Sequence, residues 1–168
     1  MASRLSASKI KRSVARRMLR PILNYVYETR VVIGGKDSRL TIGERVATSN
    51  AIFNVSSGNI YIGSRTIFSH NVMVITGQHR FNEGKRYSLD PKYDDGSWGG
   101  GLDEVPDHGF DISIGGGVFI GAGAIILGGV SIGDNCIIGA GAVVTKSFPS
   151  YSVVVGVPAR IIGDTRNY

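Results

Sequence analysis

The sequence predicts an all-β protein in which short parallel strands wind into a triangular solenoid. Three observations support this fold class: an aliphatic residue recurs at every sixth position, glycine often follows it, and a second apolar or small residue lies four positions after the first. A period of six fits neither the helical period of about 3.6 nor a long strand of period two. It fits a strand of three or four residues followed by a tight turn, where glycine and asparagine tolerate positive φ.

The repeat is most regular between residues 114 and 149. The aliphatic position is filled without a slip by Ile114, Ile120, Ile126, Ile132, Ile138 and Val144, and the second position by Val118, Ala124, Val130, Cys136, Ala142 and Phe148. Three units close one triangular coil, and coils stacked about 4.8 Å apart bury both positions along the axis. This stretch therefore supplies two coils. Cys136, the single cysteine, is expected to be a packed core thiol.

The preceding residues carry the same frame less regularly. The aliphatic position is filled by Ile62, Phe68 and Val74 within residues 62–79, and a fainter copy starts at Ile42. Residues 31–168 are therefore expected to form one β-solenoid domain, interrupted once. The interruption, residues 80–111, is polar and rich in glycine, and loops longer than about 15 residues in compact domains are usually functional or disordered. We expect this insertion to be an active-site loop.

Residues 1–30 are expected to form a basic arm. They hold eight of the 19 Lys and Arg residues and one of the 13 Asp and Glu residues, so the remainder of the chain is close to neutral. Nucleic-acid binding by the body of the protein therefore has no electrostatic support. Apolar residues recur at helical spacing in the arm, at Ile10, Val14, Met18, Ile22 and Tyr25, with Pro21 expected to kink or break the helix.

Two roles are open for this arm. Its apolar face could cover an open end of the solenoid, or residues 1–20 could bind the anionic surface of a membrane, where each nearby Lys or Arg contributes about 1 kcal/mol. The sequence contains neither a secretory signal peptide nor an apolar run of the roughly 18 residues that span a bilayer. Together with the lone cysteine, this predicts a cytoplasmic protein, with peripheral contact at the inner face of the membrane if the arm binds lipid.

Two segments resemble a known family. Residues 60–79, IYIGSRTIFSHNVMVITGQH, and residues 112–163, which run through GAVVTKSF and end in VGVPARIIG, are similar to the hexapeptide-repeat acyltransferases. The similarity is greatest to the branch of maltose, galactoside, nodulation-factor and polysaccharide O-acetyltransferases. It implies a left-handed parallel β-helix, acetyl-CoA as the acyl donor, and a homotrimer with the donor in a groove between two subunits. The sequence departs from the family at Phe119, where tryptophan is common, in the long insertion and in the arm.

The resemblance assigns roles to individual residues. His79 matches the catalytic histidine, which would act as a general base and remove the proton of the attacking hydroxyl. The residues that match family contacts to coenzyme A are Ala122, Ala140, Thr145 and Lys146, and Arg160 lies with Pro158 and Ala159 by the adenine end. Lys146 and Arg160 could neutralise phosphate charge.

The other candidate residues carry open alternatives. Trp98, in the insertion, could stack on a sugar ring or anchor the loop. His108 could orient His79 or the acceptor, and His70 is expected to be a solvated turn residue. Zinc enzymes of the γ-carbonic anhydrase class share this fold, but the spacings between the three histidines do not assemble their three-histidine site, so no metal is expected.

These expectations converge on an acetyl-CoA-dependent O-acetyltransferase of a sugar or polysaccharide hydroxyl, of the kind used in polysaccharide biosynthesis. Transfer would be direct, because Cys136 is predicted to be buried. Two alternatives remain. One is N-acetylation of an amino sugar or a xenobiotic, and the other is a non-catalytic β-helix that serves as a scaffold.

Overall fold

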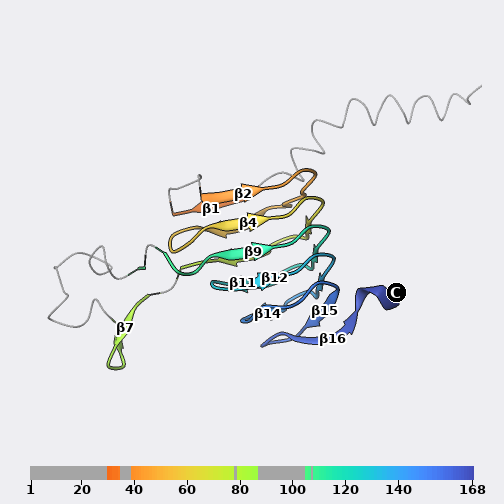
Figure 1. Cartoon of the computed structure of the whole chain (residues 1–168). Coiled ribbons are helices and arrows are strands. Elements are labelled where there is room, and N and C mark those ends of the chain that lie inside the picture. Colours follow the sequence, from red (N-terminus) through yellow and green to blue (C-terminus); the bar gives the residue numbers. More distant parts are fainter. Residues whose placement is uncertain (1–29, 35–38, 78, 87–104, 107) are drawn as a thin grey trace, which may run out of the picture.

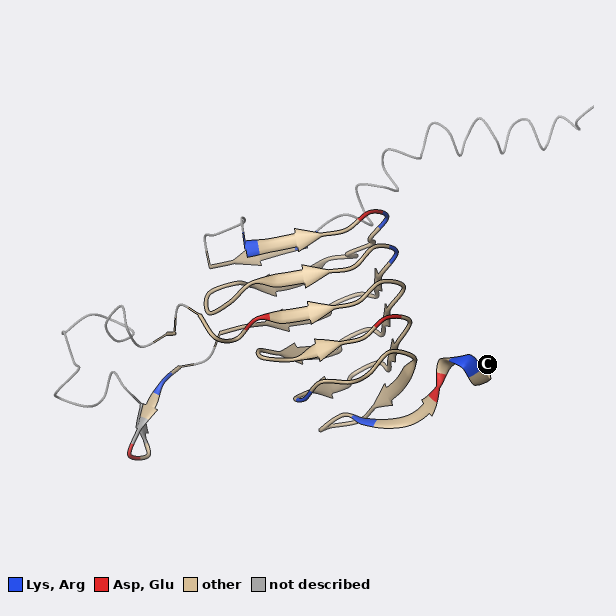
Figure 2. Cartoon of the chain, viewed as in Figure 1, with Lys and Arg blue, Asp and Glu red and all other residues tan. Residues whose placement is uncertain are grey.

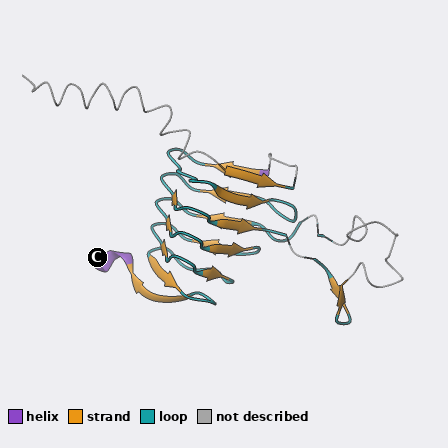
Figure 3. Ribbon diagram, turned by 180° about the vertical axis from the view of Figure 1, so that it is seen from behind, coloured by secondary structure: helices purple, strands orange, loops and turns teal. Residues whose placement is uncertain are grey.

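The computed structural model describes residues 30–34, 39–77, 79–86, 105–106 and 108–168. The predicted arm, apart from Arg30, and most of the insertion, including Trp98, lie outside the described residues. The described residues wind as a stack of coils in which short strands alternate with turns (Figure 1, Figure 3). None of the helices that these residues form has the length and apolar character needed to span a bilayer.

Each coil contributes strands to three sheets. The first sheet contains β1 (Arg30–Ile33), β3 (Ala51–Asn54), β6 (Met73–Ile75), β11 (Ile125–Leu127) and β14 (Val143–Val144). The second contains β2 (Leu40–Ile42), β4 (Ile60–Ile62), β9 (Ile112–Ile114) and β12 (Ser131–Ile132). The third contains β5 (Ile67–Phe68), β10 (Phe119–Ile120), β13 (Ile137–Ile138), β15 (Ser152–Val155) and β16 (Arg160–Asp164). Pairing in the three sheets is parallel, except that β16 folds back antiparallel on β15.

The hydrophobic core runs along the axis of the coils, as the six-residue repeat predicts. All twelve residues predicted to point inward between 114 and 148 are buried, and the most exposed of them, Phe148, has 4% exposed surface. The aliphatic positions of successive coils pair directly, Ile62 with Ile114 and Ile114 with Ile132. Each coil therefore rests its aliphatic side chains on those of the next, and the core continues past the insertion.

Three corners connect the sheets. The first corner leads from the first sheet to the second, the second corner from the second sheet to the third, and the third corner from the third sheet back to the first. Strands β2 to β6 and β9 to β15 contain no Lys, Arg, Asp or Glu, so the charges of the described β-helix gather at corners and at the terminal strands (Figure 2).

The second corner repeats regularly from coil to coil. Its residues with positive φ form one column: Arg45 (58°), Arg65 (62°), Gly117 (67°), Asn135 (55°) and Tyr151 (67°). The N–H groups of the last four donate to carbonyl groups of the preceding coil at 2.8 or 2.9 Å. The third corner has a similar column at Asn50, Asn71, Gly123 and Gly141. At the third corner the N–H groups of Asn71, Gly123 and Gly141 also donate to the preceding coil, so both columns hold neighbouring coils in register.

The C-terminal end of the second sheet is closed by serine hydroxyls. Ser147 Oγ accepts a hydrogen bond from the Ser131 N–H group at 2.8 Å, and Ser150 Oγ accepts one from the Asp134 N–H group at 3.0 Å. The Ser147 hydroxyl takes the place of a carbonyl group, such as that of Val130, which accepts from the Ser113 N–H group one coil earlier. The Ser150 hydroxyl repeats the side-chain acceptors of earlier coils, Ser64 Oγ and Asp134 Oδ1.

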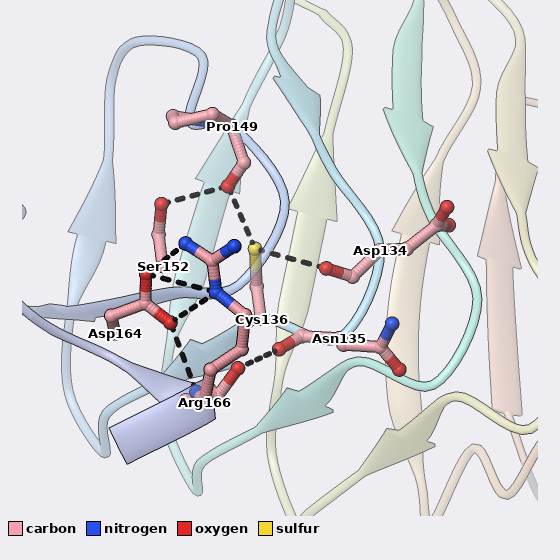
Figure 4. A network of polar contacts seen from close by, with 8 residues as sticks. Asp134, Asn135, Cys136, Pro149, Ser152, Asp164 and Arg166 are labelled. Atoms are coloured by element: carbon pink, nitrogen blue, oxygen red, sulfur yellow. Dashed lines mark hydrogen bonds and ion pairs between the residues drawn. The ribbon is translucent and has the colours of Figure 1, made fainter.

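A polar network attaches the end of the chain to the second corner (Figure 4). Thr165, in the short 3-10 helix η3 (Thr165–Asn167), donates from Oγ1 to the Asn135 carbonyl at 2.9 Å. The Arg166 guanidinium contacts the Asp164 carboxylate and lies 4.8 Å from the centre of the Tyr151 ring. The hydrogen bonds from Arg166 lower the pKa of Asp164 to about 2.

Candidate active site

The insertion leaves and re-enters the β-helix at the first corner, between β6 and β9. After His79 the chain forms the antiparallel hairpin of β7 (Phe81–Asn82) and β8 (Lys85–Arg86), which projects away from the coils (Figure 1). It returns through His108 and Phe110. We call the described residues Thr76, Gly77 and His79 the outgoing stem, and residues 108–111 the returning stem. Both stems therefore start from the same corner of the same coil.

The outgoing stem is anchored to the preceding coil by Thr76, which has 1% exposed surface. Thr76 Oγ1 donates to the Asn54 carbonyl at 2.8 Å and accepts a hydrogen bond from the Ser57 N–H group at 3.1 Å. The Thr76 N–H group also donates to the Asn54 carbonyl, at 3.1 Å. His79, three residues later, thus extends from a fixed point of the coil.

The returning stem is anchored to the same turn. The Phe110 N–H group donates to the Ser57 carbonyl at 3.2 Å, and Asp111 Oδ1 accepts a hydrogen bond from the Asn59 N–H group at 2.7 Å. The next coil closes over both stems at Gly128, where an added Cβ atom would lie 2.7 Å from the Thr76 carbonyl oxygen and 2.8 Å from Phe110 Cβ. The base of the insertion is therefore a packed, hydrogen-bonded unit.

The structure places two of the three histidines on these stems. His79 and His108 are both exposed at the first corner, whereas His70 is exposed at the third corner, beside Asn71. His70 matches the prediction of an exposed turn residue. Within the part of the chain that the structure describes, no group of three or more His, Cys, Asp or Glu side chains is arranged to hold a metal ion.

Two of the predicted donor contacts, Ala122 and Ala140, are exposed at the third corner. They stack in successive coils, since the Gly141 N–H group donates to the Ala122 carbonyl at 2.9 Å. The turn after β15 continues this stack of third-corner turns, because the Val143 N–H group donates to the Gly156 carbonyl at 3.0 Å. Arg160 begins β16 directly after this turn.

Two further predicted donor contacts, Thr145 and Lys146, are exposed at the first corner of the last complete coil, after β14. The Lys146 ammonium group lies 5.9 Å from the centre of the Phe148 ring. In a single chain, the first sheet therefore separates these residues from Ala122 and Ala140. The structure does not bring all five predicted donor contacts together within one chain.

Cys136 is buried, as predicted, with 1% exposed surface. Its Sγ atom lies 3.2 Å from the Pro149 carbonyl oxygen and 3.8 Å from that of Asp134 (Figure 4). Burial raises the pKa of the thiol above its ordinary value. A buried thiol with a raised pKa is a poor nucleophile.

Sequence reasoning missed the residues that support the first corner. Besides Thr76 and Ser57, they include Arg39, whose Nη1 atom donates to the carbonyl groups of Val55 at 3.3 Å and Ser56 at 3.2 Å. The available signal was a break in the repeat, because Ser57 and its neighbours lengthen the connection between β3 and β4 to five residues, whereas the strands of the regular coils are connected by three or four. Trp98, the predicted acceptor contact, lies outside the described residues.

Comparisons with known proteins identify the repeat. The family model described as Bacterial transferase hexapeptide (six repeats) matches residues 111–146. No sequence among the curated proteins matches significantly.

Solved structures extend the likeness to the whole chain. A maltose O-acetyltransferase from Clostridium difficile 630 is 27% identical, with 96% of this chain and 79% of that chain covered and a TM-score of 0.59. The polySia specific acetyltransferase NeuO is 28% identical, with 75% and 52% covered and a TM-score of 0.55. A galactoside acetyltransferase in complex with coenzyme A is 24% identical, with 97% and 74% covered and a TM-score of 0.60, and shares the fold.

These likenesses confirm the predicted left-handed parallel β-helix and the predicted family resemblance, and they support acyltransferase activity. The chain carries the bacterial transferase hexapeptide repeat and has the fold of the hexapeptide-repeat acetyltransferases.

Proposed function

We propose that the protein is an acetyl-CoA-dependent O-acetyltransferase that acts on a sugar or polysaccharide hydroxyl, with His79 as the general base. The observation that carries this proposal is the position of His79, exposed on an anchored stem at the point where the insertion leaves the coil. The maltose O-acetyltransferase and the polySia specific acetyltransferase, both more than 25% identical, support a saccharide as the acceptor.

His79 would act by accepting a proton. As the acceptor oxygen attacks the thioester carbonyl of acetyl-CoA, its proton passes to the neutral imidazole, and a tetrahedral intermediate forms. The intermediate collapses to the acetyl ester and expels the thiolate of coenzyme A, which takes the proton from the imidazolium. Backbone N–H groups at the turns could stabilise the oxyanion. Direct transfer agrees with the burial of Cys136.

The donor would lie along the third corner. Ala122 and Ala140 would line the pantetheine arm, while Lys146 and Arg160 would neutralise phosphate charge. Thr145 and Lys146 stand on the far side of the first sheet from the two alanines, so a groove shared by two chains would supply all of these contacts. Trp98 remains our candidate for contact with the sugar ring.

We also propose a homotrimer, because a donor groove shared by two chains requires more than one copy. The outward faces of the first and third sheets are apolar, with exposed fractions of 53% for Val31, 49% for Ile67 and 45% for Phe119. The outward face of the second sheet instead carries hydroxyl groups, at Thr41, Tyr61, Ser113 and Ser131. A closed ring of three copies would cover apolar faces and leave the hydroxyl face in water. Sedimentation of a fully active monomer would refute the trimer.

The role of the basic arm is a separate proposal, which rests on sequence alone. We propose that residues 1–20 bind anionic membranes and that the enzyme works at the cytoplasmic face, on a lipid-linked saccharide. Co-sedimentation with anionic liposomes should be sensitive to salt and should disappear when these residues are deleted. Equal binding to neutral and anionic liposomes at low salt would instead favour a structural cap.

The test of the activity is acetyl transfer from labelled acetyl-CoA to a panel of acceptors. We expect label on glycan hydroxyls and its release by mild base, as an ester requires. Label that appears only on amino sugars or other amines would establish the N-acetyltransferase alternative. A scaffold would show no saturable binding of coenzyme A in a titration.

A further inference from the structure

Ser57 lies at the first corner, between the two stems of the insertion, and has 0% exposed surface. Its Oγ atom has no hydrogen-bond partner among the described residues. The Ser57 backbone, by contrast, donates to Thr76 Oγ1 at 3.1 Å and accepts from the Phe110 N–H group at 3.2 Å. Ser57 thus holds both stems through its backbone while its hydroxyl is unpaired.

The hydroxyl of Ser57 is close to the backbone of the outgoing stem. A Cβ atom built on Gly77 would lie 3.5 Å from Ser57 Oγ and 3.5 Å from Asn54 Oδ1. Asn54 Oδ1 already accepts a hydrogen bond from the Ser56 N–H group, at 2.9 Å. Since Gly77 has no side chain, the Ser57 hydroxyl can approach the backbone that leads, two residues later, to His79.

A buried hydroxyl without a partner destabilises a folded protein, because it gives up its hydrogen bonds to water. Alanine at position 57 would occupy nearly the same volume without this penalty. Unpaired buried polar groups are uncommon in native structures and call for a specific explanation, such as a role in catalysis. Ser57 lies beside the stem that carries the candidate base, and this location supplies such an explanation.

We propose that Ser57 is a positioning residue for His79, a role that rests on the proposed acetyltransferase activity. In the complex with acetyl-CoA and acceptor, the Ser57 O–H group donates a hydrogen bond to the backbone carbonyl of Gly77. This bond fixes the outgoing stem and holds the imidazole within reach of the acceptor hydroxyl. Ser57 does not touch the substrates. It acts through the stem, because general-base catalysis is sensitive to small displacements of the base.

The test compares Ser57→Ala with a matched control, Thr66→Val. Thr66 also has 0% exposed surface, but it lies at the second corner. Its Oγ1 atom donates to the Gly115 carbonyl at 2.8 Å and accepts from the Val118 N–H group at 3.3 Å. One variant therefore removes an unpaired hydroxyl beside the outgoing stem, and the other removes a paired hydroxyl at a different corner.

We expect Ser57→Ala to raise Tm by about 2 to 4 °C and to lower kcat about tenfold, with an unchanged KM for acetyl-CoA. Thr66→Val should lower Tm by a similar amount and leave kcat unchanged. A gain in stability together with a loss in turnover distinguishes a positioning role from a purely structural one.

A Ser57→Ala enzyme with wild-type kcat overturns the proposal, whatever its Tm. If that variant does not fold, Ser57→Gly, which also lacks the hydroxyl, takes its place under the same criterion. Failure of the wild-type protein to acetylate any acceptor overturns the proposed function, and this role with it. If the wild-type protein is active and Ser57→Ala has the same turnover, only the proposed role of Ser57 is overturned.

Discussion

The first and second corners are built on the same six-residue repeat, yet their turns differ. At the second corner, each coil places a residue of positive φ over that of the coil before it, and N–H groups such as that of Asn135 bond from coil to coil. At the first corner, the turns vary in length and the insertion leaves the coil. The hydroxyls of Ser57 and Thr76 are buried at this corner, and Thr76 Oγ1 accepts a hydrogen bond from the Ser57 N–H group.

The difference between the corners indicates where this solenoid can tolerate substitutions and insertions. The second corner leaves no room at Gly63, where an added Cβ atom would lie 2.4 Å from the Gly116 nitrogen. The first corner is also tight at Gly128, but it has space at Gly77, where the nearest atoms would be 3.5 Å away. We infer that the second corner maintains the register of the coils, while the irregular first corner presents the candidate base.

The largest expected effect is on turnover, from His79→Ala at the first corner. We expect kcat to fall by about 100-fold or more, because a general base typically contributes a factor of 10² to 10⁴. Tm should hardly change, because His79 is exposed. Steady-state kinetics and thermal unfolding check the two parts. Near-normal turnover by a folded variant would show that another group takes the proton.

A pair of glycine variants tests the two corners for stability. Gly63→Ala should cost about 1 to 3 kcal/mol, since backbone atoms of the next coil must move to admit the methyl group, and Tm should fall by several degrees. Gly77→Ala should leave Tm within about 2 °C of the wild type, because its new contacts are of ordinary length. Equal losses in thermal unfolding would contradict the contrast between the corners.

A pair of charge variants tests whether donor binding uses the first and third corners and leaves the second corner free. Lys146→Ala should raise KM for acetyl-CoA about three- to tenfold through the loss of a charged contact to phosphate, with a smaller change in kcat. Arg45→Ala removes an exposed positive charge at the second corner and should leave KM unchanged. An equal rise in both variants would indicate a general electrostatic effect, which high salt would remove.

The smallest effect concerns the chain end that packs on the second corner. Arg166 holds the pKa of Asp164 at about 2, below its ordinary value of 3.8, so the ionised carboxylate favours the folded state above pH 4. This contribution is lost as pH falls from about 4 to 2. The pair is exposed, so Asp164→Asn should lower Tm at pH 7 by less than about 1 °C, and the difference should vanish near pH 2. A Tm difference that grows towards low pH would contradict this sign.

Much of the fold could be predicted because it depends on short-range spacing. A residue's place within its six-residue unit determines whether it points inward, and for this reason the predicted core, including Cys136, is confirmed. The same spacing placed His79 at the end of a regular run of units, before a polar insertion. These features need only the geometry of a strand and a turn.

Contacts between coils could not be predicted in the same way. Residues that pair in adjacent coils are separated by 18 positions between Ile114 and Ile132, but by 52 between Ile62 and Ile114. Sequence spacing alone did not show that Phe110 and Thr76 bond to one turn of an earlier coil, or that Ser57 Oγ is buried there without a partner among the described residues.

The sequence by itself therefore determined the repeat and the inward residues, since both follow from the local alternation of strand and turn, and its resemblance to the family named the candidate base. Only the tertiary structure decided which residues share a corner. It brought His79 and His108 onto two stems anchored to one turn, and it placed Ala122 and Lys146 on opposite sides of the first sheet. The physical reason is that hydrogen bonds between coils, and the length of each turn, set the register of residues far apart in the chain.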